Sequence, residues 1–310
     1  DDIAVRAFRL EPEQINIVNK MSKGDQLILA CAGSGKSVLL ISKCFKSAKM
    51  NPDKKFLITC FNRNLQSLYT WYIERAGLQE RNVECCTFDG LCKRLLERND
   101  LFLPVGESII ESRRHAAMKG FEKGKIKDRY YGIFIDEVQM FELSWYKFAY
   151  NLLENKENGD HIFVICGDKT QEIKQRQKHG KAPWNAGEGY PVYRGGNKSI
   201  RIEKNFRNCI EINDYINRYA QYARAIIKMH NPEEQFDPDM FLRGQAFRHG
   251  GGVKIKQFNG NAVAEAEKVV ESVKTIHDDK GVPYDEIAIA MYFRKYKPLN
   301  YYLEYALVKV

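Results

Sequence analysis

The chain has 310 residues, of which 44% are apolar and 29% are charged, and this composition is typical of a folded, soluble protein. No apolar run reaches the roughly 18 residues of a membrane-spanning helix, and the first residues lack a secretory signal pattern, so we expect a soluble protein. The length predicts about two domains, and the formal net charge of +9 favours a polyanionic partner.

The cysteine and histidine patterns argue against disulfide and zinc frameworks. None of the eight cysteines forms a C-x-x-C pair, and five of them lie in or beside apolar runs. The six histidines are scattered without metal-ligand spacing. We therefore expect buried free thiols in a reducing, cytoplasmic compartment.

Short apolar runs alternate with segments of helical periodicity along the chain. The predicted strands are, in order, Gln26–Cys31, Lys55–Cys60, Val83–Thr87, Tyr131–Ile135, His161–Cys166, Ser199–Glu203, Val253–Gln257 and Glu286–Met291. The predicted helices include Ser37–Lys46, Leu65–Ala76, Leu143–Leu153, Ile210–Ala223 and Ala262–His277. This alternation predicts an α/β fold, with parallel sheets covered by helices on both faces. The Gly- and Pro-rich stretch Gly180–Asn197 is interpreted as a connector between two such units.

Residues 30–37, A-C-A-G-S-G-K-S, match the phosphate-binding P-loop pattern except that Ala30 stands at its first glycine. The segment follows the first predicted strand and opens a predicted helix, which is the context that the pattern requires. The alternative is a glycine turn before a helix with a chance lysine.

The residue types of this loop suit a nucleoside triphosphate with Mg²⁺. Glycines let backbone N–H groups point at phosphate oxygens, the lysine contacts the β and γ phosphates, and the serine offers a hydroxyl to Mg²⁺. The helix N-terminus adds positive potential. The predicted nucleotide-binding residues are Ala32, Gly33, Ser34, Gly35, Lys36 and Ser37, with Ser37 also a metal ligand.

Two acidic residues, Asp136 and Glu137, directly follow the predicted strand Tyr131–Ile135. This position is the sheet edge where ligands bind in parallel sheets. Asp136 is predicted to hold Mg²⁺, and Glu137 to orient and deprotonate the attacking water. The alternative is a pair of solvated acids at a strand end, which is common.

Two further segments have polar residues after apolar runs. Gln171 can contact the γ-phosphate or the attacking water, and Arg207 can stabilise charge on the transferring phosphoryl group. Phe206 is placed to stack on adenine. Read alone, the first segment is better explained as a surface turn, and the second as a surface arginine beside a core phenylalanine.

Taken together and in this order, the segments resemble the motifs of UvrD/Rep-like superfamily 1 helicases. Residues 10–14 resemble the Q motif, 30–37 motif I, 59–64 motif Ia, 87–91 motif Ib, 136–139 motif II, 167–171 motif III and 205–207 motif IV. The stretch from 253 to 307 resembles the start of the second motor domain.

This resemblance implies two tandem RecA-like P-loop domains, residues 1–195 and 196–310, the second one incomplete, with ATP and Mg²⁺ between them. It implies that Gln14 reads the adenine, and that Gln171 and Arg207 respond to the γ-phosphate. It also implies single-stranded DNA contacts by Phe61, Asn62, Arg63, Thr87 and Phe88. For the two phenylalanines the alternative is packing in the core.

The chain departs from the family pattern in several places. The large helical insertion between motifs Ib and II is reduced to a stretch with a basic run, 113–129, and a second basic cluster spans 174–181. These runs are either nucleic-acid contacts or a solvated surface. No aromatic residue directly follows motif III, and no segment like motifs V and VI is present.

Two classes of function follow from these observations. The first is an ATP-dependent helicase or translocase acting on single-stranded or partly duplex DNA. The second is a nucleotide-dependent nucleic-acid-binding module or fragment without unwinding activity of its own, completed by a protein partner or a further C-terminal region. RNA remains open as the nucleic acid, because contacts to its 2′-hydroxyls leave no legible signal in this sequence.

Overall fold

The computed structural model describes residues 10, 12–20, 23–77, 82–102, 109–168, 182–193, 198–230, 232, 244–255, 257, 259–290 and 297–308. The chain divides into two compact units, Asp1–Gly252 and Val253–Val310. The division falls at Gly252, whereas the predicted domain boundary lies at residue 195, so the assignment of two motor domains stays a prediction.

The first unit alternates strands with helices. Its strands are β1 (Gly24–Ala30), β2 (Phe56–Cys60), β3 (Val83–Thr87), β4 (Gly132–Ile135), β5 (Ile162–Gly167), β6 (Ser199–Ile202), β7 (Lys204–Asn205) and β8 (Gln245–Ala246). Its helices are α2 (Pro12–Lys20), α3 (Lys36–Met50), α4 (Arg63–Arg75), α5 (Phe88–Arg98), α6 (Ile109–Glu122), α7 (Leu143–Asn151) and α8 (Ile210–His230), with a 3₁₀ turn at Val138–Met140.

Six strands form one sheet in the order β3-β2-β4-β5-β1-β6, and all of its neighbouring strands are parallel. A second, two-stranded sheet pairs β7 with β8. The six predicted strands between residues 26 and 203 are confirmed, and so is the α/β fold. Since all strands of the main sheet are parallel, their carboxyl ends meet at one edge.

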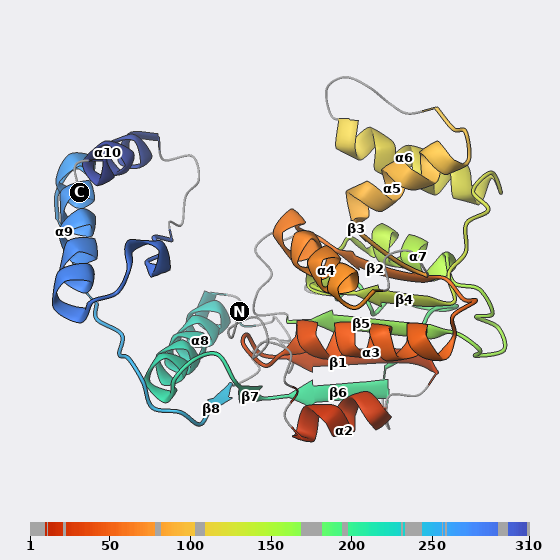
Figure 1. Cartoon of the computed structure of the whole chain (residues 1–310), viewed down its shortest axis with the longest axis horizontal. Helices are drawn as coiled ribbons and strands as arrows, with labels where there is room; N and C mark the ends of the chain where they lie inside the picture. The colour runs from red at the N-terminus through yellow and green to blue at the C-terminus, as the bar shows by residue number, and fades with distance from the viewer. Residues whose placement is uncertain are drawn as a thin grey trace. The chain divides into compact units, whose positions relative to one another are not determined.

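Alternate residues of each strand feed two hydrophobic layers, one on each face of the sheet. In β1, Leu27 and Leu29 join a core cluster with α5, α6 and α7, whereas Ile28 and Ala30 join a cluster with α3 and α4. Figure 1 shows α3 and α4 lying across one face of the sheet. Burial on both faces explains why these strands are continuous apolar runs without alternation.

All eight cysteines are free, and all but Cys209 are buried, as predicted. Burial raises the pKa of the Cys31 thiol, in the loop after β1, to about 11. The thiol is therefore protonated at neutral pH and makes a weak hydrogen bond to the Glu203 carbonyl.

The second unit contains α9 (Ala262–Lys280), a 3₁₀ turn at Tyr284–Glu286 and α10 (Lys297–Leu307). Ala266, Val270 and Leu303 form a small buried cluster between the two helices. The strands predicted at 253–257 and 286–291 are wrong over the residues described there, none of which forms a strand. A strand is stable only beside a hydrogen-bonding neighbour, and the described part of this unit offers none. No helix in the described part of the chain is long and apolar enough to span a bilayer.

Candidate functional site

The loop between β1 and α3 has the backbone geometry of an anion-binding turn. Gly33 and Gly35 adopt φ angles of +78° and +84°, which favour glycine, and Gly35 directly precedes α3. The Ser34 N–H bonds the Cys31 carbonyl at 3.3 Å and closes the turn. The Ser34 hydroxyl is buried and finds no hydrogen-bond partner among the described residues. An orphaned buried donor beside a helix N-terminus fits a site for phosphate oxygens.

Lys36, the first residue of α3, folds back over this loop. Its ammonium lies 3.1 Å from the Ala30 carbonyl oxygen, 3.3 Å from that of Cys31 and 3.8 Å from a carboxylate oxygen of Asp168. The side chain is only 6% exposed, so the charge sits inside the loop and is held by these acceptors. A phosphate entering the loop would replace carbonyl oxygens with anionic ones, which bind an ammonium more strongly.

Ser37 and Asp136 meet beside Lys36, although they lie 99 residues apart in the sequence. The Ser37 hydroxyl bonds Asp136 Oδ2 at 2.6 Å, and Asp136 stands at the end of β4, fully buried. Tyr69 from α4 also donates its hydroxyl to Asp136 Oδ2. The Glu137 N–H donates to the other carboxylate oxygen at 2.9 Å.

This donor set fits Mg²⁺ held jointly by protein and phosphates. Mg²⁺ takes hard oxygen ligands and commonly uses one or two protein groups with substrate phosphates and waters. Ser37 and Asp136 supply a hydroxyl and a carboxylate at adjacent positions. The described residues hold no cluster of three His, Cys, Asp or Glu side chains that could bind a metal without phosphates.

Glu137 has a backbone conformation that is rare outside glycine. Its φ and ψ angles are 53° and 42°, and it precedes the 3₁₀ turn at Val138–Met140. Burial, followed by the neighbouring Asp136 charge, raises the pKa of its carboxyl. Strained residues with raised carboxyl pKa values cluster at active sites, which makes Glu137 a candidate general base.

Gln139 connects Glu137 to the end of β5. Its amide nitrogen donates to the Glu137 carboxylate, and its amide oxygen accepts the Asp168 N–H at 3.1 Å. Because Asp168 is also 3.8 Å from Lys36, one network joins the ends of β4 and β5 to the loop after β1. These strands are neighbours in the sheet, so their carboxyl ends bring the groups together.

Gln14, on α2, contacts the outside of the loop. Its amide nitrogen donates to the Ser34 carbonyl at 3.2 Å. A methyl carbon placed on Gly35 would lie 2.4 Å from the same nitrogen and would displace the Gln14 amide, and the φ angle of +84° independently favours glycine there. The predicted role of Gln14 in reading adenine stays a prediction.

The turn after β7 packs against the other side of the loop. The Phe206 N–H donates to the Gly33 carbonyl at 2.8 Å, and Asn205 accepts the N–H groups of Arg207 and Asn208 at 3.1 and 2.9 Å. The structure therefore places Arg207 beside Gly33 within the first unit, whereas the sequence analysis assigns it to a second domain. Gln171 lies outside the described residues.

The residues predicted to bind single-stranded DNA lie at the carboxyl ends of β2 and β3. Asn62 accepts the Leu65 N–H and caps α4, and Thr87 accepts the Gly90 N–H and caps α5. Phe61 is half-buried, whereas Asn62 and Arg63 are exposed. The side chains of Asn62 and Thr87 therefore cap helices. Asn62 and Arg63 are exposed and accessible to a ligand.

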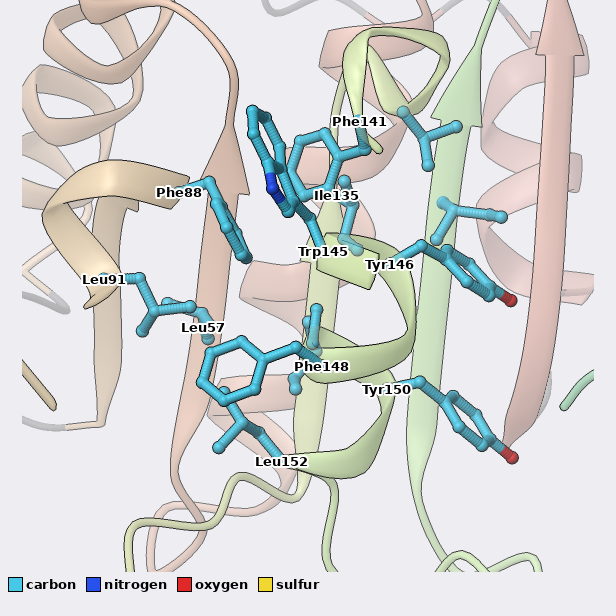
Figure 2. Packing of buried hydrophobic residues seen from close by; sticks show 14 of the residues in the cluster. Leu57, Phe88, Leu91, Ile135, Phe141, Trp145, Tyr146, Phe148, Tyr150 and Leu152 are labelled. Carbon is cyan, nitrogen blue, oxygen red and sulfur yellow. The ribbon is translucent and has the colours of Figure 1, made fainter. Parts of the chain in front are cut away.

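Phe88 is buried in an aromatic cluster, as Figure 2 shows. Its ring is 2% exposed, stacks on Trp145 with centroids 4.9 Å apart, and meets Phe141 and Phe148 edge-on. A ring enclosed in this way cannot stack on a nucleic-acid base, so packing in the core accounts for it and we leave Phe88 out of the interface.

In the basic run 113–129, arginine side chains contact other residues of the protein, whereas the lysine side chains are exposed. Arg114 pairs with Asp89 and lies 4.0 Å from the Trp145 ring centroid, and Arg129 lies over Phe121. The lysines at 119, 123, 125 and 127 are exposed. The second basic cluster, 174–181, lies outside the described residues.

Sequence reasoning assigned no role to three residues of the network: Tyr69, and Gln139 and Asp168 within the motif-like segments. Gln139 and Asp168 follow β4 and β5 closely, and the rule that parallel strands gather polar residues at their carboxyl ends identifies both. Tyr69 lies in the middle of a helix, where periodicity marks it as a core residue and carries no further signal.

The comparisons with known proteins add the following. The search of curated proteins found no match. Among solved structures, the chain is similar to the Pif1 helicase from Candida albicans, with 18% identity and a TM-score of 0.38 over 69% of this chain and 44% of that one, so it spans less than half of that protein's length. A family model described as an AAA domain matches residues 14–177, which is more than half of the chain and contains every residue of the network around Lys36. The chain therefore belongs to the AAA domain family.

Proposed function

We propose that the chain is an ATP hydrolase that uses Mg²⁺. The observation that carries this proposal is the meeting of Lys36 and Ser37 on the P-loop helix with Asp136 from the end of β4, through the 2.6 Å Ser37–Asp136 hydrogen bond. Ser37 and Asp136 would hold Mg²⁺, which when bound neutralises charge on the phosphates.

In this proposal Lys36 exchanges its carbonyl acceptors for the β and γ phosphates. Glu137 orients a water whose oxygen attacks the γ-phosphorus, and its carboxylate takes the proton as the bond to the bridging oxygen of ADP breaks. Arg207, held beside Gly33 by the Asn205 turn, would stabilise the developing charge. Gln171 would sense the γ-phosphate.

We propose further that this hydrolase is a superfamily 1 motor of the UvrD/Rep type, acting on single-stranded or partly duplex DNA, with motor domains at residues 1–195 and 196–310. The order of the motif-like segments supports this proposal, as do the net positive charge and the exposed Arg63 at the start of α4. The buried, unpaired thiols support a cytoplasmic location.

The second candidate is a nucleotide-dependent binding module without unwinding activity of its own, completed by a partner or a further C-terminal region. One observation favours it: the described part of residues 253–310 contains two packed helices and no sheet. A motor of the proposed type requires a second domain that contacts the ATP bound to the first.

The test compares Lys36→Ala with Lys49→Ala, which removes an exposed lysine from the same helix. We expect Lys36→Ala to abolish tight ATP binding and turnover, and Lys49→Ala to match the parent chain. Normal nucleotide affinity in Lys36→Ala would reject the assignment.

Two further assays separate the candidate functions. A motor predicts that single-stranded DNA stimulates ATP turnover, in a salt-dependent way, and that a partly duplex substrate is unwound. A binding module predicts nucleotide-dependent DNA binding without unwinding. Replacing the DNA with RNA of the same sequence settles which nucleic acid is preferred.

A further inference from the structure

Among the described donors of hydrogen bonds to the Asp136 carboxylate, Tyr69 is the one that no motif-like segment contains. It lies in α4, two turns after the helix begins, and its side chain is 1% exposed in the core between α3, α4 and the sheet. Its hydroxyl donates to Asp136 Oδ2, the oxygen that also accepts the Ser37 hydroxyl. The hydroxyl therefore reaches from the apolar core into the charged site.

Three groups donate to the Asp136 carboxylate: the Ser37 and Tyr69 hydroxyls on Oδ2 and the Glu137 N–H on Oδ1. A hydroxyl can offer a lone pair to a metal ion and still donate its hydrogen, so Ser37 can serve Asp136 and the metal together. Ser37 belongs to the loop that the nucleotide would contact, whereas Tyr69 donates from a helix packed in the core. Without Tyr69, Oδ2 depends on Ser37 alone, and the carboxylate is less firmly held against rotation about its Cβ–Cγ bond.

We propose that Tyr69 is a positioning residue that fixes the carboxylate of Asp136 for Mg²⁺, an inference that rests on the proposed function. Its rigidity comes from the packing of α4: the ring belongs to the same core cluster as Leu39, Ile58 and Phe134. Groups that hold a metal ligand in place typically contribute about 10- to 100-fold to metal affinity.

Tyr69→Phe tests the proposal, because it removes the hydroxyl and keeps the ring. Tyr131→Phe is the matched control: Tyr131 is equally buried in the same cluster, and its hydroxyl bonds Asp160 at 3.1 Å, at the opposite edge of the sheet. The probe is Mn²⁺ in the presence of saturating ADP, and the concentration of free Mn²⁺ is measured by electron paramagnetic resonance. ADP affinity in EDTA and the thermal unfolding midpoint are measured in parallel.

We expect Tyr69→Phe to weaken Mn²⁺ binding about tenfold or more, to leave ADP affinity in EDTA within about twofold, and to show an unfolding midpoint close to that of Tyr131→Phe. Mn²⁺ affinity unchanged within about twofold would overturn the positioning role. Equal losses with and without metal would also overturn it, because they would indicate a packing role. If the parent chain itself binds no Mn²⁺ with ADP, the proposed function fails as well, so the two failures are distinguishable.

Discussion

Replacing Gly33 with alanine tests how closely the turn after β7 approaches the P-loop. Gly33 has a φ angle of +78°, and a methyl carbon placed on it would lie 2.4 Å from Asn205 Oδ1 and 2.8 Å from Arg207 Cβ. Contacts this short do not occur between real atoms of these kinds, so the Asn205–Asn208 turn must move or the loop must open.

The size of the effect follows from two separate costs. An alanine at a positive φ angle costs about 1–2 kcal/mol, whatever surrounds it. Moving Asn205 also breaks the two part-buried hydrogen bonds from the N–H groups of Arg207 and Asn208, each of which contributes about 0.5–1.5 kcal/mol, or about 1–3 kcal/mol together. We therefore expect Gly33→Ala to lower the free energy of unfolding by about 2–5 kcal/mol.

Gly77→Ala is the control, because Gly77 has a φ angle of +64° and open space around its Cα. It carries the backbone cost alone, so we expect a loss of about 1–2 kcal/mol in urea unfolding. If the two variants agree within about 0.5 kcal/mol, the turn does not approach Gly33 and the placement of Arg207 beside the P-loop is refuted.

Three other predictions test the core and the charged groups. Phe88→Ala should lower the free energy of unfolding by about 3–5 kcal/mol, because it opens a cavity beside Trp145; a stable variant with weaker DNA binding would contradict the packing role. Glu137→Gln should keep ATP affinity and lose about 10²–10⁴-fold in turnover, and the acid limb of the parent turnover should lie above the ordinary glutamate range, since the pKa is raised and activity disappears as the carboxylate protonates. Unchanged turnover in Glu137→Gln would exclude it as the base. Burial raises the pKa of Glu84, but hydrogen bonds, led by that from Arg98, outweigh burial and leave a net lowered pKa. The stability gap between the parent chain and Glu84→Gln should therefore be full at neutral pH and shrink as the pH falls through the ordinary and then the lowered pKa; a gap independent of pH would contradict this assignment.

Much of the first unit could be predicted because its signals are local. Strands buried on both faces are apolar runs, and helices packed on one face repeat their apolar residues every three to four positions. The residues from Gly33 to Ser37 follow one another in sequence, so the P-loop pattern contains the whole turn. Asp136 was predictable because it directly ends an apolar strand.

The unpredicted parts depend on tertiary contacts that leave no local pattern. Tyr69 and Phe88 are both buried aromatic residues of helices, yet one reaches a charged site and the other packs against Trp145. Nothing in the neighbouring sequence distinguishes these outcomes, since each depends on which helix lies opposite. The strands predicted at 253–257 and 286–291 failed for a related reason: an apolar run becomes a strand only where a neighbour pairs with it.

The charged side chains of the site have partners within the protein, and these partners affect how tightly a nucleotide can bind. Lys36 donates hydrogen bonds to two carbonyl oxygens and lies near Asp168. Ser37 donates to the Asp136 carboxylate, and Gln139 donates to that of Glu137. A nucleotide must exchange these bonds, so its affinity reflects the difference between phosphate and protein acceptors and not the full strength of each new contact. The Ser34 hydroxyl is different, because it has no partner among the described residues to give up. A phosphate oxygen that bonds Ser34 therefore relieves an existing penalty, so Ser34→Ala should weaken nucleotide binding by more than loss of an ordinary surface hydrogen bond, while stabilising the free protein.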